Sequence, residues 1–416
     1  MINSTLKKDY FWNTVGVFAQ NVISPLLLVV ITRINGIYDS GIFSFAFSIS
    51  VIFLALGMWG GRTFQVSDVR KEFSTQSYLA VRVILSFIML VCAVVFCIVN
   101  NYDLLKSAVI LALVLVKVLE TISDAIYATM QANNKLYRSG MSLTYKAILS
   151  ILLFVTVDLL THNLLLSAVS LIVANLFFVT LYDIPKMRIF ENSNVRIKKY
   201  KAIGIEALSV MRRSLPVFAV TFLAMFSLNI PRYFLDLYHT NEIGFFGIIV
   251  MPITLISLAI SFLIQPNVVH LSKLYESRQY KKFDRIVTWL ILAALIVGFV
   301  ATVVAYFIGI PVLNFVFGLN FDVHRFALIV VVMGASINAV VAIYMTIMVI
   351  MRRFKAPFYI FLSTNASLVV LSLFYIKEHG LVGSVILFSG INAVQAILFT
   401  IYYKLSLRKS RYEKAN

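Results

Sequence analysis

The chain has 416 residues, of which 61% are hydrophobic and 13% are charged. Its mean hydropathy of +0.92 excludes an ordinary soluble domain, in which about a quarter of the residues are charged. Apolar runs of about 20 residues recur from end to end, which is typical of a polytopic α-helical membrane protein. We therefore predict an all-α polytopic membrane protein, and its net charge of +18 needs an explanation within that class.

In chain order, the apolar runs predict twelve transmembrane helices. They cover residues 10–34, 40–61, 79–100, 104–130, 141–161, 163–185, 213–238, 243–270, 285–309, 322–351, 356–376 and 380–404. The first run follows two lysines and could pass for a signal peptide. It contains polar residues and lacks a small-residue cleavage site, so we expect a retained helix. The two cysteines, Cys92 and Cys97, lie on different faces of one run and indicate neither a disulfide nor a metal site.

The basic residues are distributed unequally between the two sets of loops. Thirty of the 36 Lys and Arg residues fall in the two tails or in alternate loops, with Arg62, Arg82 and Lys146 among them. Because Lys and Arg accumulate on the cytoplasmic side of membrane proteins, both termini should be cytoplasmic. The positive charge then reflects topology and not nucleic-acid binding. It should also attract the anionic head groups of membrane lipids.

The longest basic connection, residues 186–213, divides the chain into two halves of six predicted spans, 1–193 and 194–416. Its second part places apolar and basic residues on different sides of a helix. This pattern predicts a basic amphipathic linker helix on the membrane surface; a solvated linker is the alternative. The two halves suggest a repeat, and transporters built from such repeats carry substrate between them. We therefore expect two six-helix bundles around a central cavity.

A stripe of charge crosses the fourth predicted span. Lys117, Glu120 and Asp124 share one face of this helix with Tyr127 and Gln131. Charged groups at membrane depth are costly and usually face a protein interior or a water-filled cavity. We expect Lys117 to line the cavity as a counter-charge, and Glu120 or Asp124 to carry a coupling H⁺ or Na⁺. The alternative is a structural ion pair between Lys117 and Glu120, three residues apart.

Two arginines lie at matching ends of the two halves. Arg33 ends the first span and Arg232 lies near the end of the seventh, and each precedes a short polar turn. A guanidinium group binds phosphate through two hydrogen bonds, so these residues are candidate substrate ligands at the outer mouth. The alternative is that each anchors its helix to the outer head groups.

Uncharged polar residues on several spans complete the predicted substrate-lining set. They are Asn13, Gln20 and Ser24 in the first span, Gln265 in the eighth and Asn338 in the tenth. Such residues line polar pathways, but they also join helices by hydrogen bonds within a membrane. Both roles remain open at the level of sequence.

The chain resembles the Wzx-type O-antigen and capsule-unit flippases of the MOP (MATE-like) superfamily. The resemblance covers essentially the whole chain and rests on three motifs besides the twelve spans. They read R-I-N-G-I-Y-D-S-G-I-F-S at 33–44, G-G-R-T-F-Q-V-S-D-V-R at 60–70 and P-N-V-V at 266–269.

This resemblance implies a flippase in the bacterial plasma (inner) membrane. Its substrate would be an undecaprenyl-pyrophosphate-linked oligosaccharide unit of O-antigen, as in lipopolysaccharide, or of a capsule. Alternating access would move the unit from the cytoplasmic to the extracytoplasmic leaflet. The polymerase and the chain-length regulator of the pathway are possible partners.

Three other functions compete with this one, and the polar stripe in the middle of the fourth span disfavours one of them, a non-transporting scaffold. A MATE-like multidrug or cation antiporter often carries an acid in its first span, whereas this span has only amides before Arg33. An oligosaccharide polymerase is expected to have a large extracytoplasmic loop, and the outer loops here are short. The chain has no phosphate-binding G-x-x-x-x-G-K-[ST] loop and no nucleophile motif. We therefore expect a transporter and not an enzyme, without a cofactor and with H⁺ or Na⁺ as the coupling ion.

Overall fold

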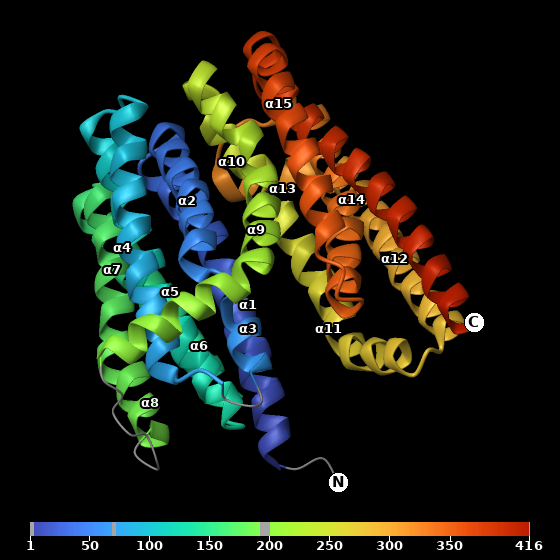
Figure 1. The fold of residues 1–416 in the computed structure, drawn as a ribbon. Coiled ribbons are helices and arrows are strands. Elements are labelled where there is room, and N and C mark those ends of the chain that lie inside the picture. Colours follow the sequence, from blue (N-terminus) through green and yellow to red (C-terminus); the bar gives the residue numbers. More distant parts are fainter. Residues whose placement is uncertain (1–3, 69–71, 192–199, 416) are drawn as a thin grey trace. The chain divides into compact units, whose positions relative to one another are not determined.

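The computed structural model describes residues 4–68, 72–191 and 200–415, and the whole of this part is helices and short connections. By its packing, the chain forms two compact units, residues Met1–Met225 and Phe226–Asn416. We call them the first and the second unit (Figure 1). The expected boundary at 193/194 lies outside the described residues.

The first unit contains eight α-helices and the beginning of a ninth. They are α1 (Ser4–Ile34), α2 (Ile37–Met58), α3 (Gly61–Ser67), α4 (Thr75–Val99), α5 (Leu104–Ala132), α6 (Leu136–Thr161), α7 (Leu164–Phe178), α8 (Ile184–Glu191) and α9 (Tyr200–Tyr238). A π-helical turn, η1 (Val179–Asp183), joins α7 to α8 without a loop. Helix α9 continues into the second unit.

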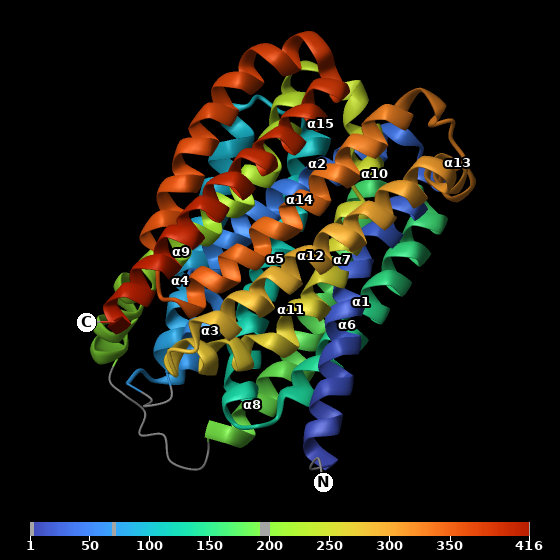
Figure 2. The same ribbon diagram turned by 90° about the vertical axis from the view of Figure 1, so that its right-hand side faces the viewer.

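The second unit continues from α9 to the C-terminus. Its elements are η2 (Thr240–Glu242), α10 (Ile243–Ile249), α11 (Pro252–Glu276), α12 (Tyr280–Val304), η3 (Ala305–Gly309), α13 (Ile310–Phe317), η4 (Asp322–His324), α14 (Arg325–Ile350) and α15 (Lys355–Ala415). Helices α12, α14 and α15 run side by side (Figures 1 and 2). Gly380 has non-helical backbone angles (φ 51°, ψ −131°) and divides α15 into two helices.

The predicted all-α polytopic architecture is confirmed. Ten segments of the described residues are long and apolar enough to cross a membrane. Helix α5 is not among them, although it has 29 residues, because Lys106, Lys117, Glu120 and Asp124 lie within it. One of the ten segments, within α15, holds the last two predicted spans on either side of Gly380. Each predicted span thus falls on one helix or on successive helical segments, whereas the central cavity between the bundles stays a prediction.

The helices expose large apolar side chains on one face, as lipid contact requires. On α12 the buried residues are Phe283, Val287, Leu290, Ala294 and Gly298. The exposed apolar ones include Trp289, Leu292, Ile296, Phe299 and Val303. Such a continuous apolar surface would promote aggregation in water, but in a bilayer the lipid tails cover it.

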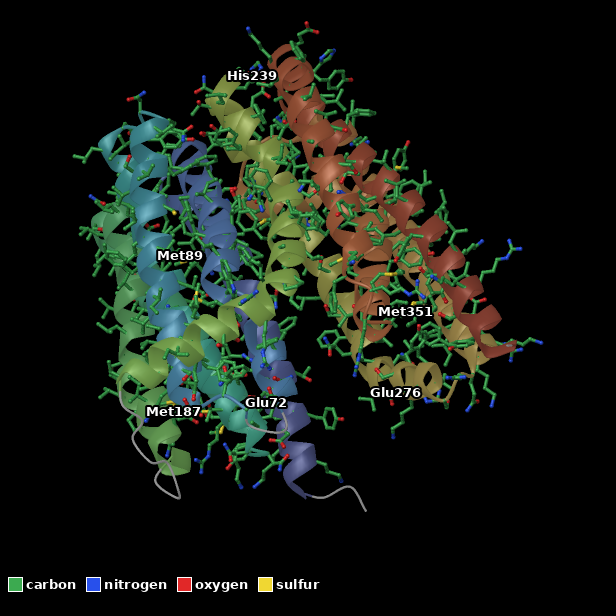
Figure 3. The ribbon with its side chains drawn as sticks, viewed as in Figure 1. Glu72, Met89, Met187, His239, Glu276 and Met351 are labelled. Carbon is green, nitrogen blue, oxygen red and sulfur yellow. The ribbon has the colours of Figure 1, made fainter. Side chains whose placement is uncertain are left out.

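The start of α9 is fixed to the first unit. Ala207 and Val210 of α9 are buried in one cluster with Tyr78, Val81 and Leu85 of α4. The Glu206 carboxylate accepts hydrogen bonds from the hydroxyls of Ser74 (3.1 Å) and Ser77 (2.7 Å). Glu72, labelled in Figure 3, pairs with Arg213 at 2.6 Å. The part of the expected linker helix that is described therefore packs on α4.

Helices α1 and α6 approach each other closely at Gly16 and Gly140. A β-carbon at Gly140 of α6 would overlap the backbone of Trp12 and Asn13 in α1, and one at Gly16 would lie 2.5 Å from the carbonyl oxygen of Gly140. Glycines at such a crossing let the two backbones touch, which is a common way to pack helices in a membrane.

We expect Gly140→Ala to destabilise the protein by about 1–3 kcal/mol, because overpacking must push α1 and α6 apart. The measurement is the melting temperature of the purified protein in detergent. Gly204→Ala in α9 is the matched control, since a β-carbon there meets nothing within 4 Å. Equal melting temperatures for the two variants would contradict the close α1–α6 contact.

Candidate functional site

The carboxylate of Asp124 in α5 lies between two arginines. Arg62 Nε is 3.1 Å from Oδ1, and Arg82 Nη2 is 3.3 Å from Oδ2. Arg82 is 4% exposed and also donates to the carbonyl oxygen of Gly57 at 3.2 Å. A buried carboxylate with two guanidinium partners has one more positive partner than its own charge requires, so either arginine alone would still compensate it.

A strained turn between α2 and α3 positions Arg62. Trp59, Gly60 and Gly61 all have positive φ angles, of 38°, 91° and 64°. The Trp59 indole donates to the carbonyl oxygen of Met211 at 2.9 Å and stacks on Phe218, with ring centroids 3.9 Å apart. Both partners belong to α9. Helix α9 therefore holds the turn from which Arg62 reaches Asp124.

Lys117 and Glu120 form an ion pair within α5. Lys117 Nζ lies 2.9 Å from Glu120 Oε1 and 3.0 Å from Oε2. The ammonium group also sits 4.8 Å from the centre of the Phe47 ring, a cation–π distance. The geometry is that of the structural ion pair weighed as the alternative. It does not by itself exclude a role in binding, because the Glu120 side chain reaches a pocket.

Asp183, at the end of the π-helical turn η1, is the centre of a second buried network. Its side chain is fully buried and pairs with Lys146 of α6 at 3.2 Å. Ser142 donates to Asp183 Oδ1 at 2.6 Å and Ser123 donates to Oδ2 at 2.9 Å. The Tyr127 hydroxyl completes the network at 2.8 Å from the Ser142 oxygen. Single π-helical turns often occur at functional sites because they re-aim a side chain out of the regular helical register.

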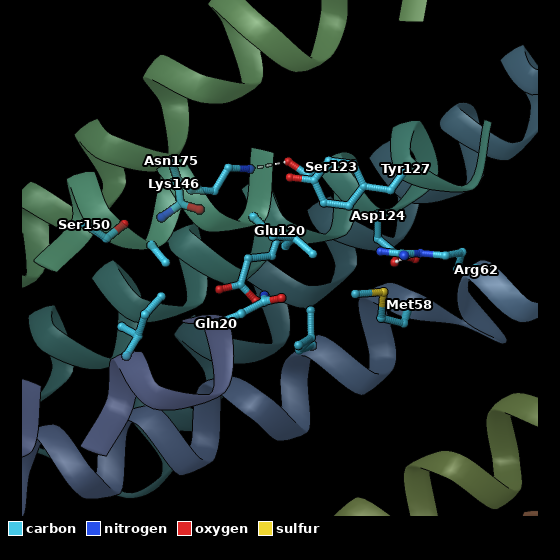
Figure 4. Close-up of a pocket in the computed structure, with 14 residues that line it drawn as sticks. Gln20, Met58, Arg62, Glu120, Ser123, Asp124, Tyr127, Lys146, Ser150 and Asn175 are labelled. Atoms are coloured by element: carbon cyan, nitrogen blue, oxygen red, sulfur yellow. Dashed lines mark hydrogen bonds and ion pairs between the residues drawn. The ribbon is translucent and has the colours of Figure 1, made fainter. Parts of the chain in front are cut away.

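A pocket of about 120 Å³ lies between these networks (Figure 4). It is lined by Gln20, Ile23, Leu54, Met58, Arg62, Glu120, Ser123, Asp124, Tyr127, Leu143, Lys146, Ala147, Ser150 and Asn175. These residues come from α1, α2, α3, α5, α6 and α7. Figure 4 shows the side chains of Gln20 and Glu120 close together in it. The pocket therefore has a polar, charged lining inside an otherwise apolar unit.

Apolar packing holds the same helices in place on the side of Tyr127. Tyr127, Ile126 and Met130 of α5 form a buried cluster with Leu143 of α6 and with Met187 of α8, which Figure 3 labels. Because Leu143 and Tyr127 also line the pocket, the cluster and the charged lining share one wall.

Three of the expected site residues meet at this pocket. Gln20, Glu120 and Asp124 line it. Lys117 does not line it but forms an ion pair with Glu120, which does. Asn13 and Ser24 are half-buried on α1 and are not among its lining residues.

The other candidates lie elsewhere. Arg33 is exposed at the end of α1. In the second unit, the Arg232 guanidinium is 5.4 Å from the centre of the Phe246 ring. Asn338 donates to Asn392 Oδ1 at 2.7 Å, and Gln265 is exposed on α11. The pairing of Arg33 with Arg232 at an outer mouth stays a prediction.

The prediction of basic loops from the sequence missed three cations of the site. Arg62, Arg82 and Lys146 were assigned to basic loops, but they lie in α3, α4 and α6, and Arg82 and Lys146 are 4% and 6% exposed. For Arg82, the wrong assignment came from placing the start of its helix too late in the sequence. Ser74 caps α4 by accepting from the backbone N–H of Ser77, so the helix begins at Thr75 and not at 79. A capping serine is a readable signal. Asp183 had no comparable signal, because a π-helical turn leaves no mark in the sequence.

The chain is similar in sequence to a known protein. No protein-family model matches the chain. The capsular polysaccharide biosynthesis protein CapF of Staphylococcus aureus is 23% identical over 398 residues, which cover 93% of this chain and 97% of that protein. The similarity therefore extends over almost the full length of both.

Solved structures of transporters have the same fold. An inward-facing multidrug resistance MATE family transporter of the MOP superfamily matches with a TM-score of 0.68 at 12% identity, over 96% of this chain and 98% of its own. The lipid II flippase MurJ, in an inward closed conformation, matches with a TM-score of 0.68 at 13% identity, over 95% and 88%. Both are transporters and not enzymes. The fold of the chain is therefore that of the MOP-superfamily transporters, which confirms the resemblance drawn from its motifs.

Proposed function

We propose that the chain is a flippase for an oligosaccharide linked to undecaprenyl pyrophosphate. Three findings support this function: the transporter fold, the likeness to the lipid II flippase MurJ, and a relative named for capsular polysaccharide biosynthesis. The name of the relative favours a capsule unit over an O-antigen unit as the substrate. The protein would work in the plasma membrane with both termini in the cytoplasm, move its substrate outward by alternating access, and operate beside a polymerase and a chain-length regulator.

The observation that carries the proposal is the excess of cations in the buried networks of the first unit. Their members are Arg62, Arg82, Lys117 and Lys146 against Glu120, Asp124 and Asp183. An apolar unit gains nothing from an excess buried cation, since its desolvation is costly, so the one excess positive charge of the networks favours an anionic ligand. The pocket itself is lined by two cations, Arg62 and Lys146, and two acids, Glu120 and Asp124. A pyrophosphate provides that anion, and guanidinium groups match its geometry.

The pocket is smaller than the proposed substrate. Sites that enclose a drug-sized molecule usually have about 300–1,000 Å³, compared with about 120 Å³ here. It therefore suits one anionic part of the head group, with the sugars and the lipid tail outside it. Glu120 has one cation partner and Asp124 has two. Glu120 is thus the better candidate for the acid that carries the coupling ion, because its protonation would break only one ion pair.

A multidrug antiporter is the second candidate, because the MATE transporter and MurJ match the chain with the same TM-score of 0.68. The fold does not separate the two functions. The pocket does favour one of them: both acids that line it are already paired with Lys or Arg. A cationic drug would have to displace those partners, whereas an anionic head group could bind Arg62 while Arg82 still compensates Asp124.

Reconstitution into liposomes tests this function directly. The protein should move a fluorescent undecaprenyl-pyrophosphate-linked disaccharide between leaflets faster than protein-free liposomes do, measured by the fraction of fluorophore that an added reductant quenches. A cationic dye serves as the competing substrate. Transport of the dye, together with disaccharide movement no faster than in empty liposomes, would overturn the flippase in favour of the antiporter.

Arg62→Gln should lower flipping roughly 10–100-fold, the loss expected for a charge-assisted hydrogen bond of about 1.5–3 kcal/mol. Its abundance in the membrane should not change, because Arg82 still compensates Asp124. Arg212→Gln is the matched control, since Arg212 is exposed on α9. Equal flipping by the two variants would remove Arg62 from the substrate path.

Water should reach the pocket at Glu120. In a background with Cys92 and Cys97 replaced by alanine, Glu120→Cys should react with a membrane-impermeant thiol reagent. Met89→Cys should not react, because Met89 is fully buried in α4. Protection of both cysteines in the presence and absence of substrate would show that the charged lining is only structural.

A further inference from the structure

Arg353 connects the turn between α14 and α15 to the C-terminal part of α15 through neutral partners. Its guanidinium donates through Nη1 to Ser406 Oγ and through Nη2 to Ser410 Oγ, both at 3.3 Å. The two serines are buried, one helical turn apart, near the end of α15. Together they fix the position and the plane of the guanidinium group.

The Arg353 side chain has hydrogen-bonding capacity left for an anion. A guanidinium group has five N–H groups, the two serine bonds use two of them, and the side chain is only half-buried. No carboxylate of the described residues forms an ion pair with Arg353, whereas Arg62 and Arg82 both pair with Asp124. The C-terminal end of α14 offers Arg353 only a partial negative charge of about half an elementary unit. The fixed guanidinium therefore keeps most of its positive charge.

Exposed basic side chains surround these three residues in the chain. Two of them flank Arg353, and two lie between the serines: Arg352, Lys355, Arg408 and Lys409. Like charges gathered at one end of a unit raise its positive potential and attract anions.

Two acids lie at the same end of the second unit. Glu276, labelled in Figure 3, is exposed and follows Tyr275, whose hydroxyl is 3.3 Å from Ser410 Oγ. The Asp284 carboxylate accepts a hydrogen bond from the Tyr403 hydroxyl at 3.1 Å. These two acids are fewer than the cations around Arg353, so the end keeps a positive excess.

The basic residues continue into exposed apolar faces of α15. At each end of this helix, a cation shares a face with two exposed apolar side chains further along the helix: Lys355 with Tyr359 and Leu362, and Arg408 with Leu405 and Ile401. Spacings of three, four and seven residues place side chains on one helix face. A ligand with a negative head and apolar chains matches this order of charge and apolar surface.

We propose that Arg353 and its basic neighbours bind the phosphate of an anionic phospholipid. A guanidinium group binds a phosphate through two N–H groups, and the acyl chains would lie on the apolar faces of α15. Free phosphate has the same charge but would leave those faces unused. The basic loops predict that this end is cytoplasmic, where anionic lipids attract basic segments. The lipid would be a resident of the membrane and not the transported substrate, so the site does not depend on the proposed function.

The test compares phosphatidylglycerol, phosphatidylcholine and inorganic phosphate as ligands of the purified full-length protein in detergent, at constant ionic strength. Phosphatidylglycerol should raise the melting temperature by roughly 3–8 °C. Phosphatidylcholine, which has no net charge, and inorganic phosphate should each give less than half of this rise. Arg353→Gln should remove at least half of the rise with phosphatidylglycerol, measured from the variant's own melting temperature without lipid. Arg353→Lys keeps the charge but not the planar group, so its rise should lie between those of the wild type and Arg353→Gln.

Arg278→Gln is the matched control. Arg278 carries the same charge at the same end, in the turn between α11 and α12, but its side chain is exposed. This variant should keep the full rise. Equal rises for Arg353→Gln and Arg278→Gln would mean that the net charge of this end attracts the lipid without a site at Arg353, which would overturn the proposal. A rise with inorganic phosphate as large as with phosphatidylglycerol would overturn it too, because the ligand would then be the phosphate alone.

Discussion

The structure of the first unit depends on the pairing of its buried charges with groups that compensate them. Desolvating an ion costs several kcal/mol, so a buried ion persists only with partners at hydrogen-bond distance. Asp124 meets this condition with two arginines and Asp183 with a lysine and two serines. These pairs join α3, α4, α6 and η1 to α5. The same bonds therefore fix the helices of the unit and create its polar pocket.

This constraint also connects the pocket to the rest of the chain. Arg62 reaches Asp124 from a turn with three successive positive φ angles, and α9 holds that turn through Trp59. Helix α9 is also the element within which the division between the two units falls. A shift of α9 near Met211 and Phe218 would move this turn and with it Arg62, so the charge of the pocket lining is coupled to the position of α9.

Much of the fold could be predicted from the sequence, because length and hydropathy are enough to identify membrane helices. The stripe of Lys117, Glu120 and Asp124 lies on α5, two of whose acids line the pocket. Its partners could not be found in the same way. Arg82 and Lys146 are the eighth and eleventh residues of their helices, but the sequence assigned both to basic loops, and Asp183 depends on a π-helical turn.

The central claim is that the buried cations of the first unit serve an anionic, lipid-linked head group. Binding of undecaprenyl pyrophosphate to the purified protein tests it most directly, with undecaprenol, which has the same tail and no phosphate, as the comparison. A ligand that binds the folded state raises the melting temperature by mass action. We expect the melting temperature to rise much more with undecaprenyl pyrophosphate than with undecaprenol. Arg62→Gln should reduce this rise. Equal rises with the two lipids would contradict it.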